Sequence, residues 1–168
     1  MLIDDPSNRV MGLPGCIELR EDACTRGKRV VLTNGCFDLL HRGHLEYLRK
    51  SAELGDLLVV AINSDESVRT LKGASRPLNS EADRAYALAC LRFVDAVFIF
   101  QGPRLANEIL ALGPDLYTKA GDYSPETLDR SEYAALVQAG TEIHILPFVA
   151  GHSTTSLIAR GAVGSGQS

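Results

Sequence analysis

The segment from residue 33 to residue 44 holds the side chains best suited to chemistry on a phosphate group. It runs Thr-Asn-Gly-Cys-Phe-Asp-Leu-Leu-His-Arg-Gly-His, between an apolar run and a segment with helical spacing. Gly35 and Gly43 let the backbone approach a phosphate closely, and a helix N-terminus offers free N–H groups with a partial positive charge. His41 and His44 are three residues apart and can face one point. The segment therefore predicts an anion site.

The glycine spacing of this segment excludes two common phosphate-binding motifs. It is neither Gly-x-Gly-x-x-Gly nor Gly-x-x-x-x-Gly-Lys-Ser/Thr, so neither a dinucleotide fingerprint nor a Walker P-loop is predicted. Cys36 is not predicted to be a nucleophile, because a thiolate mechanism needs a base and an orienting partner. It is expected to offer a backbone N–H or a small side chain beside the phosphates. Asp38 has two open readings: it orients a histidine or a metal ion, or it caps the following turn.

Two other segments carry hydroxyl or basic side chains. Ser153, Thr154 and Thr155 precede an apolar segment, and a hydroxyl there suits either a helix N-cap or the binding of a diphosphate. Lys72 and Arg76 are, by themselves, charges on a surface loop.

The elements that must position these residues alternate along the chain. Short unbroken apolar runs at 30–33, 57–62, 96–100, 116–118 and 143–146 predict strands that are covered on both faces. Helical spacing of apolar residues separates several of them, and Gly55, Gly113 and Gly140 stand where helices should stop. This pattern predicts one α/β domain with a doubly wound parallel sheet, which binds ligands beyond the carboxyl ends of its strands.

Composition narrows the class of protein. The chain has 168 residues, is 45% hydrophobic and 23% charged, and carries 17 basic against 21 acidic residues, a net charge of −4. This balance is typical of a globular domain and argues against nucleic-acid binding. No segment approaches the roughly 18 apolar residues of a membrane helix, so no membrane contact and a cytoplasmic location are expected. The four cysteines lack zinc-site spacing, so reduced thiols and no protein-held metal are predicted.

We expect a lead-in over 1–27, the domain over 28–160 and a flexible tail over 161–168.

The His-x-Gly-His motif at residues 41–44 makes the sequence resemble the cytidylyltransferase-like nucleotidyltransferases. The resemblance covers residues 28–160 and includes Asn34-Gly-Cys-Phe-Asp-Leu-Leu-His, Leu71-Lys-Gly and Ser153-Thr-Thr in family order. It implies that His41 and His44 contact the nucleotide phosphates and stabilise charge during attack on the α-phosphate. It implies further that the helix start at residues 153–155 holds the triphosphate.

The resemblance also assigns the remaining site residues. Lys72 is counted as catalytic together with the two histidines, and it binds the phosphate of the acceptor with Arg76. The arginine that follows the loop, Arg84, and Asp38 are assigned to the same acceptor site. The residues assigned to the nucleotide are Cys36, Phe37, Gly43, Lys119, Gly121, Asp122, Ser153, Thr154 and Thr155.

One branch of the family is favoured by residues 119–123. Lys119-Ala-Gly-Asp-Tyr resembles the Lys-Gly-Gly-Asp-Tyr element of the heptose 1-phosphate adenylyltransferases, with Ala120 at the first glycine position. The implied reaction is transfer of AMP from ATP to a sugar 1-phosphate, with Mg²⁺ bound through the substrate phosphates and with a homodimer expected by analogy. One alternative is a cytidylyltransferase for glycerol 3-phosphate or a similar phospho-alcohol. It is disfavoured because 147–150 lacks that branch's arginine. The other alternative is a nucleotide-binding protein without turnover.

Overall fold

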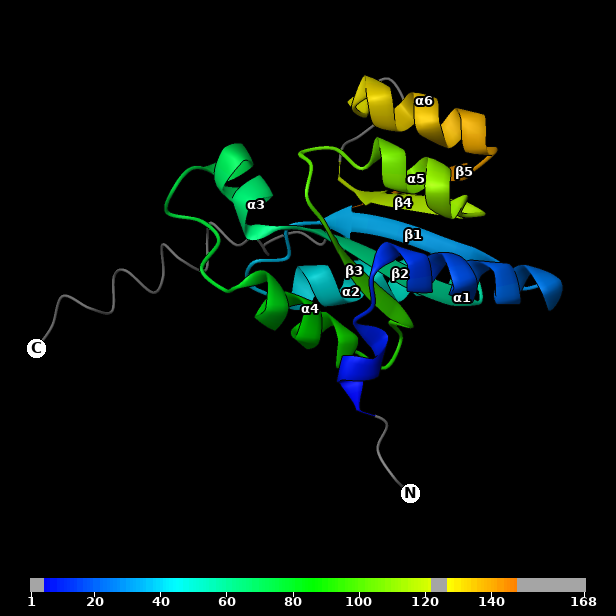
Figure 1. Cartoon of the computed structure of the whole chain (residues 1–168), viewed down its shortest axis with the longest axis horizontal. Coiled ribbons are helices and arrows are strands. Elements are labelled where there is room, and N and C mark those ends of the chain that lie inside the picture. The colour runs from blue at the N-terminus through cyan, green and yellow to red at the C-terminus, as the bar shows by residue number, and fades with distance from the viewer. Residues whose placement is uncertain (1–4, 122–126, 148–168) are drawn as a thin grey trace, which may run out of the picture.

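The computed structural model describes residues 5–121 and 127–147, which include a parallel sheet of five strands (Figure 1). The order of the strands is β3-β2-β1-β4-β5, so successive strands are added on one side of β1 and then on the other. All pairings are parallel. The strands are β1 (Val30–Gly35), β2 (Leu57–Asn63), β3 (Ala96–Phe100), β4 (Leu116–Ala120) and β5 (Glu142–Leu146). The predicted strands and the doubly wound α/β fold are confirmed.

Helices cover both faces of the sheet because both faces of its strands are apolar. Alternate residues of β1, β2 and β3 point into two separate cores. One core is closed by α1 (Leu13–Thr25), α5 (Ala106–Leu112) and α6 (Arg130–Ala139), and the other by α2 (Arg42–Ala52) and α4 (Glu81–Ala89). In Figure 1, α5 and α6 lie beside β4 and β5, and α2 and α4 lie on the opposite side of the sheet.

Local signals explain several of the helix ends. Ser64 starts α3 (Asp65–Lys72) by accepting a hydrogen bond from the Ser67 N–H, and Ser80 and Asp129 cap α4 and α6 in the same way. Gly113 and Gly140 end α5 and α6 in the left-handed conformation, as predicted.

Gly55 was predicted to stop a helix, and that prediction is wrong. The C-cap of α2 is Glu53, whose backbone has the ordinary right-handed helical conformation. Gly55 instead lies so close to β1 that an added Cβ would be 2.7 Å from the Cγ2 atom of Val31. Close approach to Val31 and to the carbonyl oxygen of Arg29, 2.9 Å from the same added Cβ, requires glycine here, and helix termination does not.

The N-terminal segment is packed against the domain. A 3₁₀ helix, η1 (Pro6–Arg9), is followed by Val10, which bridges Val97 of β3. Helix α1 occupies much of the expected lead-in, and its Cys16 and Ala23 belong to the core.

Aspartates just before the strands form hydrogen bonds at the end of the sheet where the strands begin, which is remote from the predicted anion site. Asp56, Asp95 and Asp115 accept hydrogen bonds from the backbone N–H groups of Arg29, Leu58 and Val30, each at 2.8 Å. Each bond joins the start of one strand to its neighbour. The opposite end of the sheet, at the carboxyl ends of the strands, is therefore the end left for a ligand.

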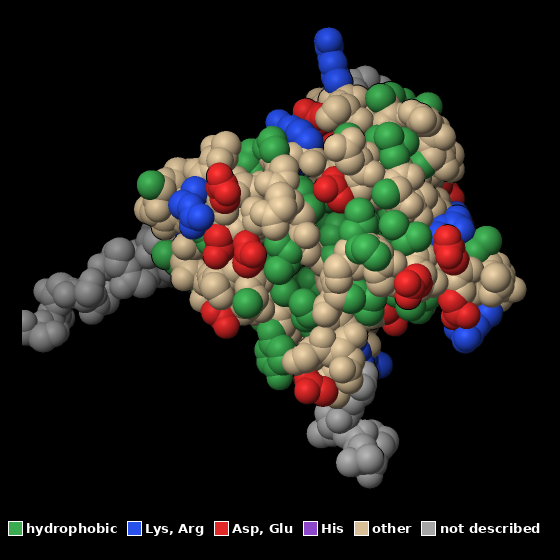
Figure 2. Space-filling view, viewed as in Figure 1, with side chains coloured by type: hydrophobic (Ala, Val, Ile, Leu, Met, Phe, Trp, Pro, Cys, Tyr) green, Lys and Arg blue, Asp and Glu red, His purple; other side chains and the backbone are tan. Residues whose placement is uncertain are grey.

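The surface in Figure 2 carries Lys and Arg side chains interspersed with Asp and Glu. Among the described residues, no helix is long and apolar enough to cross a membrane.

Candidate active site

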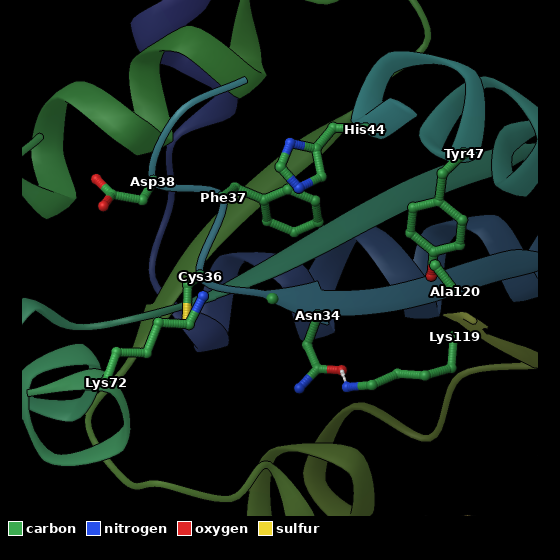
Figure 3. Close-up of a pocket in the computed structure, with 10 residues that line it drawn as sticks. Asn34, Cys36, Phe37, Asp38, His44, Tyr47, Lys72, Lys119 and Ala120 are labelled. Carbon is green, nitrogen blue, oxygen red and sulfur yellow. Dashed lines mark hydrogen bonds between the residues drawn. The ribbon is translucent and has the colours of Figure 1, made fainter. Parts of the chain in front are cut away.

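A pocket lies at the carboxyl ends of β1 and β4, the point where the strand order reverses (Figure 3). Parallel sheets bind ligands at this position, because the backbones of the loops on either side diverge and leave a crevice. The pocket is lined by Asn34, Gly35, Cys36, Phe37, Asp38, His44, Tyr47, Lys72, Lys119 and Ala120.

Aromatic contacts hold the two histidines of the 41–44 motif together. The rings of His41 and His44 stack with their centroids 3.8 Å apart, and Phe37 meets His44 edge-on at 5.3 Å. Phe37 has a positive φ of 46°, and its ring lies over Gly35, where an added Cβ would be 2.9 Å from it. Glycine at position 35 is thus required for Phe37 to support His44.

His44 is electrically neutral at pH 7 in this environment. Burial lowers its pKa to about 4, and electrostatic interactions with His41 and Lys72 add to the lowering, against an opposing backbone interaction with Leu39. Its Nδ1 atom is buried and has no hydrogen-bond partner among the described residues. Because Nδ1 is shielded from solvent, the part of the ring that lines the pocket, and not this nitrogen, is what a ligand meets.

Two lysines reach the pocket from different elements. Lys72 is the exposed last residue of α3, and Lys119 lies near the end of β4. Burial lowers the pKa of Lys119, and the carboxylate of Glu132 opposes that shift. The pocket thus combines two ammonium groups and an imidazole with one carboxylate, that of Asp38, which is an arrangement suited to a polyanion.

Asp38 and Arg76, both predicted to bind the acceptor, pair with each other. The Nη1 atom of Arg76 donates to Asp38 at 2.7 Å, and the backbone N–H groups of Leu78 and Asn79 donate to the other carboxylate oxygen. Burial alone would raise the pKa of Asp38, but these hydrogen bonds hold it below its usual value. Asp38 therefore holds the loop 73–80, called the basic loop because it carries Arg76, against the end of β1. Neither interpretation of Asp38 from the sequence predicted this role.

Arg84 was predicted to contact the acceptor, and its position in the structure argues against that role. Its side chain is 0% exposed. The guanidinium donates to the carbonyl oxygens of Asn79, Cys36 and Asn63 and to the carboxylate of Asp65, at 2.6 to 3.1 Å. With its donors engaged in this way, Arg84 joins the ends of β1 and β2 to the basic loop, and we assign it a structural role.

The other predicted residues divide into those near the pocket and those outside the described part of the chain. Cys36 lines the pocket, and its thiol lies 3.7 Å from Asn63 Oδ1. Gly43 is in the first turn of α2, beside His44. Gly121 has a φ of 123° and donates to the carbonyl of Leu146. Asp122, Ser153, Thr154 and Thr155 lie outside the described residues.

Two residues that line the pocket, Asn34 and Tyr47, were assigned no role in the site from the sequence. Asn34 Oδ1 accepts from Tyr117 Oη at 2.7 Å and from Lys119 Nζ at 3.0 Å. Because a lysine can only donate, the amide nitrogen of Asn34 must point the other way, and Figure 3 shows it turned away from Lys119. The sequence signals for Asn34 were its position at the end of an apolar run and its place at the start of the Asn34-Gly-Cys-Phe match.

Within residues 5–121 and 127–147, no group of three or more His, Cys, Asp or Glu side chains could hold a metal ion. The oxygens of Asp38 are already engaged. These residues fit a metal ion that arrives bound to a substrate phosphate better than one held by the protein.

Comparisons with known proteins find related sequences. The sequence model of the cytidylyltransferase-like family matches residues 32–160. A protein of Geotalea uraniireducens named "Bifunctional protein HldE" is 45% identical over 161 residues, which are 96% of this chain and 32% of that protein. The protein of the same name from Pelobacter propionicus is 51% identical over 136 residues, which are 80% and 27%. The chain thus spans about a third of the length of these relatives.

Solved structures show the same fold. A lipopolysaccharide core biosynthesis protein from Thermoplasma volcanium superposes with a TM-score of 0.60 and 27% identity, covering 73% of this chain and 98% of that one. A pantoate-beta-alanine ligase from Francisella tularensis has a TM-score of 0.54 at 14% identity, covering 92% and 77%, which is a likeness of fold alone.

Replacing Arg84 by Lys should lower the free energy of unfolding by about 2 to 4 kcal/mol, because a single ammonium cannot satisfy three carbonyls and a carboxylate in the same places. Urea denaturation measures the change. Arg69→Lys, on the exposed face of α3, is the matched control and should change stability by less than about 0.5 kcal/mol. Equal stabilities of the two variants would contradict the structural role of Arg84.

The depressed pKa of His44 should make stability fall as the pH is lowered from about 6.5 to about 4. The unfolded chain takes up a proton near 6.5, whereas folded His44 resists protonation until about 4, so acid favours the unfolded state in that window. Between pH 7 and pH 5 the wild type should lose about 1 kcal/mol more than His44→Gln, after allowance for partial solvation. Urea unfolding of both proteins at both pH values measures the difference, and identical losses would contradict a neutral His44.

Proposed function

The chain belongs to the cytidylyltransferase-like family, and on that premise we propose that it transfers an adenylyl group from ATP to heptose 1-phosphate. The products are the ADP-sugar and pyrophosphate. The observation that carries the proposal is the meeting of His44, Lys72 and Lys119 at one pocket, from three different elements, where the strand order of the sheet reverses.

The reaction is a direct displacement at phosphorus. An oxygen of the acceptor phosphate attacks the α-phosphorus of ATP, a new P–O bond forms, and the bond to the β-phosphate oxygen breaks and leaves its electron pair on pyrophosphate. Such a step needs two anions held in line and their charge neutralised, with no covalent bond to the protein. Cations and N–H donors are therefore the groups that this chain has to supply.

The described residues offer these groups on two sides of the pocket. His44, which lines the pocket, donates a ring N–H to an oxygen of the triphosphate, and His41 stacks against it. Bound phosphate would favour the charged imidazole and raise the pKa of His44 from its low value in the free protein. Lys119, fixed by Asn34, contributes its charge from β4.

The acceptor phosphate is assigned to Lys72. Arg76 is held by Asp38, so Lys72 is the basic side chain of this region that ends at the pocket without an ion pair among the described residues. ATP enters as its Mg²⁺ complex, and the ion neutralises charge on the phosphate oxygens that hold it.

The choice of ATP and a heptose phosphate rests on relatives and on one segment of sequence. The relatives named "Bifunctional protein HldE" are 45% and 51% identical, and the Thermoplasma structure is titled a lipopolysaccharide core biosynthesis protein. The segment from Lys119 to Gly121 supports the same branch. The cytoplasmic location and the homodimer stay predictions.

Release of pyrophosphate tests the proposal. ATP or CTP is offered with heptose 1-phosphate and then with glycerol 3-phosphate, with and without Mg²⁺. Release is expected only with ATP, the heptose phosphate and Mg²⁺, and His44→Ala should slow it by about 10²- to 10⁴-fold because it removes a group at the developing charge. His144→Ala, which changes a histidine on β5 that pairs with Glu142, is the matched control and should leave the rate unchanged.

Other outcomes would select the alternatives. Release with CTP and glycerol 3-phosphate would replace the proposal by a cytidylyltransferase. ATP binding that is the same in wild type and His44→Ala, with no release in any pair, would indicate a nucleotide-binding protein.

Lys72→Ala should raise the KM for the acceptor by about 10- to 100-fold and change the KM for ATP by less than about threefold, because it removes one charge-assisted hydrogen bond to the acceptor phosphate. Steady-state kinetics with each substrate varied in turn measures the split. Lys28→Ala, an exposed lysine before β1, is the control. The opposite split would assign Lys72 to the nucleotide.

A further inference from the structure

A network of buried hydroxyl groups joins α2 to β1 and β4, beginning one helical turn after His44, and neither the sequence motifs nor the proposed chemistry uses it. Tyr47 and Ser51 of α2, Thr33 of β1 and Thr118 of β4 are its members, and each is between 0% and 7% exposed. Thr33 and Thr118 are paired in the register of β1 and β4. The network therefore spans the junction at which the strand order reverses.

Each hydroxyl proton in the network has an acceptor. Tyr47 Oη lies 2.6 Å from Thr33 Oγ1 and 3.2 Å from Thr118 Oγ1. Thr33 Oγ1 donates to the carbonyl of Thr118 at 3.2 Å, Thr118 Oγ1 donates to Ser51 Oγ at 2.9 Å, and Ser51 Oγ donates to the carbonyl of Tyr47 at 3.0 Å. Thr33 can donate either to that carbonyl or to Tyr47 Oη, and Tyr47 then donates to Thr33 or to Thr118, so every hydroxyl proton has an acceptor in both arrangements. A fully satisfied buried network makes the groups that form it rigid.

This network fixes α2 in a way that its apolar contacts do not. Leu48 buries its side chain in the core below the helix, but apolar packing is not directional and allows a helix to rotate or slide slightly. The hydroxyl of Tyr47 is held to two strands at once, which sets both the rotation and the height of α2 over the sheet. His44 is one helical turn before Tyr47, so its ring moves with any rotation of the helix.

We propose that Tyr47 is a positioning residue for His44: its hydroxyl, held by Thr33 and Thr118, places the imidazole in the pocket between Phe37 and His41. Burial raises the pKa of Tyr47, which keeps the hydroxyl protonated as the network requires. Tyr47 also lines the pocket with its ring, so the same side chain joins the wall of the site to the sheet. The consequence for turnover rests on the proposed function, whereas the position of the imidazole does not.

The test compares Tyr47→Phe with Ser51→Ala. Both variants remove one hydroxyl of the network from the same helix, but Ser51 lies one turn farther from His44, does not line the pocket, and leaves the contacts of Tyr47 with both threonines in place. Tyr47→Phe should lower kcat by about 10- to 100-fold and change each KM by less than about threefold, because misplacement by about 1 Å costs up to about 10²-fold. Ser51→Ala should keep kcat within about threefold.

A second readout does not depend on turnover. In the free protein, the NMR titration of the His44 imidazole should move from about 4 toward 6.5 in Tyr47→Phe, as the displaced ring gains water, and should stay near 4 in Ser51→Ala. Thr33→Val removes the partner hydroxyl from β1 with little change of shape, and it takes the place of Tyr47→Phe if that variant does not fold.

The outcomes are separable. If no nucleotide is turned over by the wild type, the proposed function fails, and the titration alone decides the role of Tyr47. An unmoved His44 titration in both Tyr47→Phe and Thr33→Val would overturn the proposal. So would equal effects of Tyr47→Phe and Ser51→Ala on both readouts, since the network would then act only on stability.

Discussion

The reversal of strand order between β1 and β4 is the constraint on which the rest of the molecule depends. The chain leaves β1 toward β2 on one side and returns to β4 on the other, so the loops at this junction diverge and open a crevice. Thr33 and Thr118 pair across it on one face, where they hold α2. On the opposite face Asn34 and Lys119 meet. The same two strands thus position a histidine from one side and an ammonium group from the other.

Charged residues near the pocket divide by how their hydrogen-bonding capacity is used. Arg84 uses its donors within the protein, where it joins the ends of β1 and β2 to the basic loop, and one nitrogen of Arg76 pairs with Asp38. Lys72 is the last residue of α3, directly before the basic loop, and its side chain lines the pocket. An arginine has a rigid fork of donors that suits fixed carbonyl and carboxylate partners, whereas a lysine is a compact charge on a flexible stem. The division follows from that difference.

Much of the fold follows from the sequence because its causes are local. Apolar runs covered on both faces are typical of strands in a parallel sheet, and Gly113 and Gly140 are typical of helix ends. Gly55 was misassigned because the requirement there is an approach to Val31, more than twenty positions earlier in the chain. The helix α3 was not predicted, although Ser64 caps it, because its eight residues are mostly polar and bury only Ser67 and Val68.

The order of the elements, the place of segment 33–44 at the end of the first strand and the spacing of its two histidines follow from the sequence, since these depend on neighbours along the chain. Only the tertiary structure decided which cations remain available. Arg76 and Arg84 look like Lys72 in the sequence, but Asp38 and the carbonyls of Cys36 and Asn63 come from other loops to engage them. The hydroxyls of Thr33, Tyr47 and Thr118 likewise become a network only when β1, α2 and β4 are brought together, because a hydrogen bond depends on distance in space and not on separation in sequence.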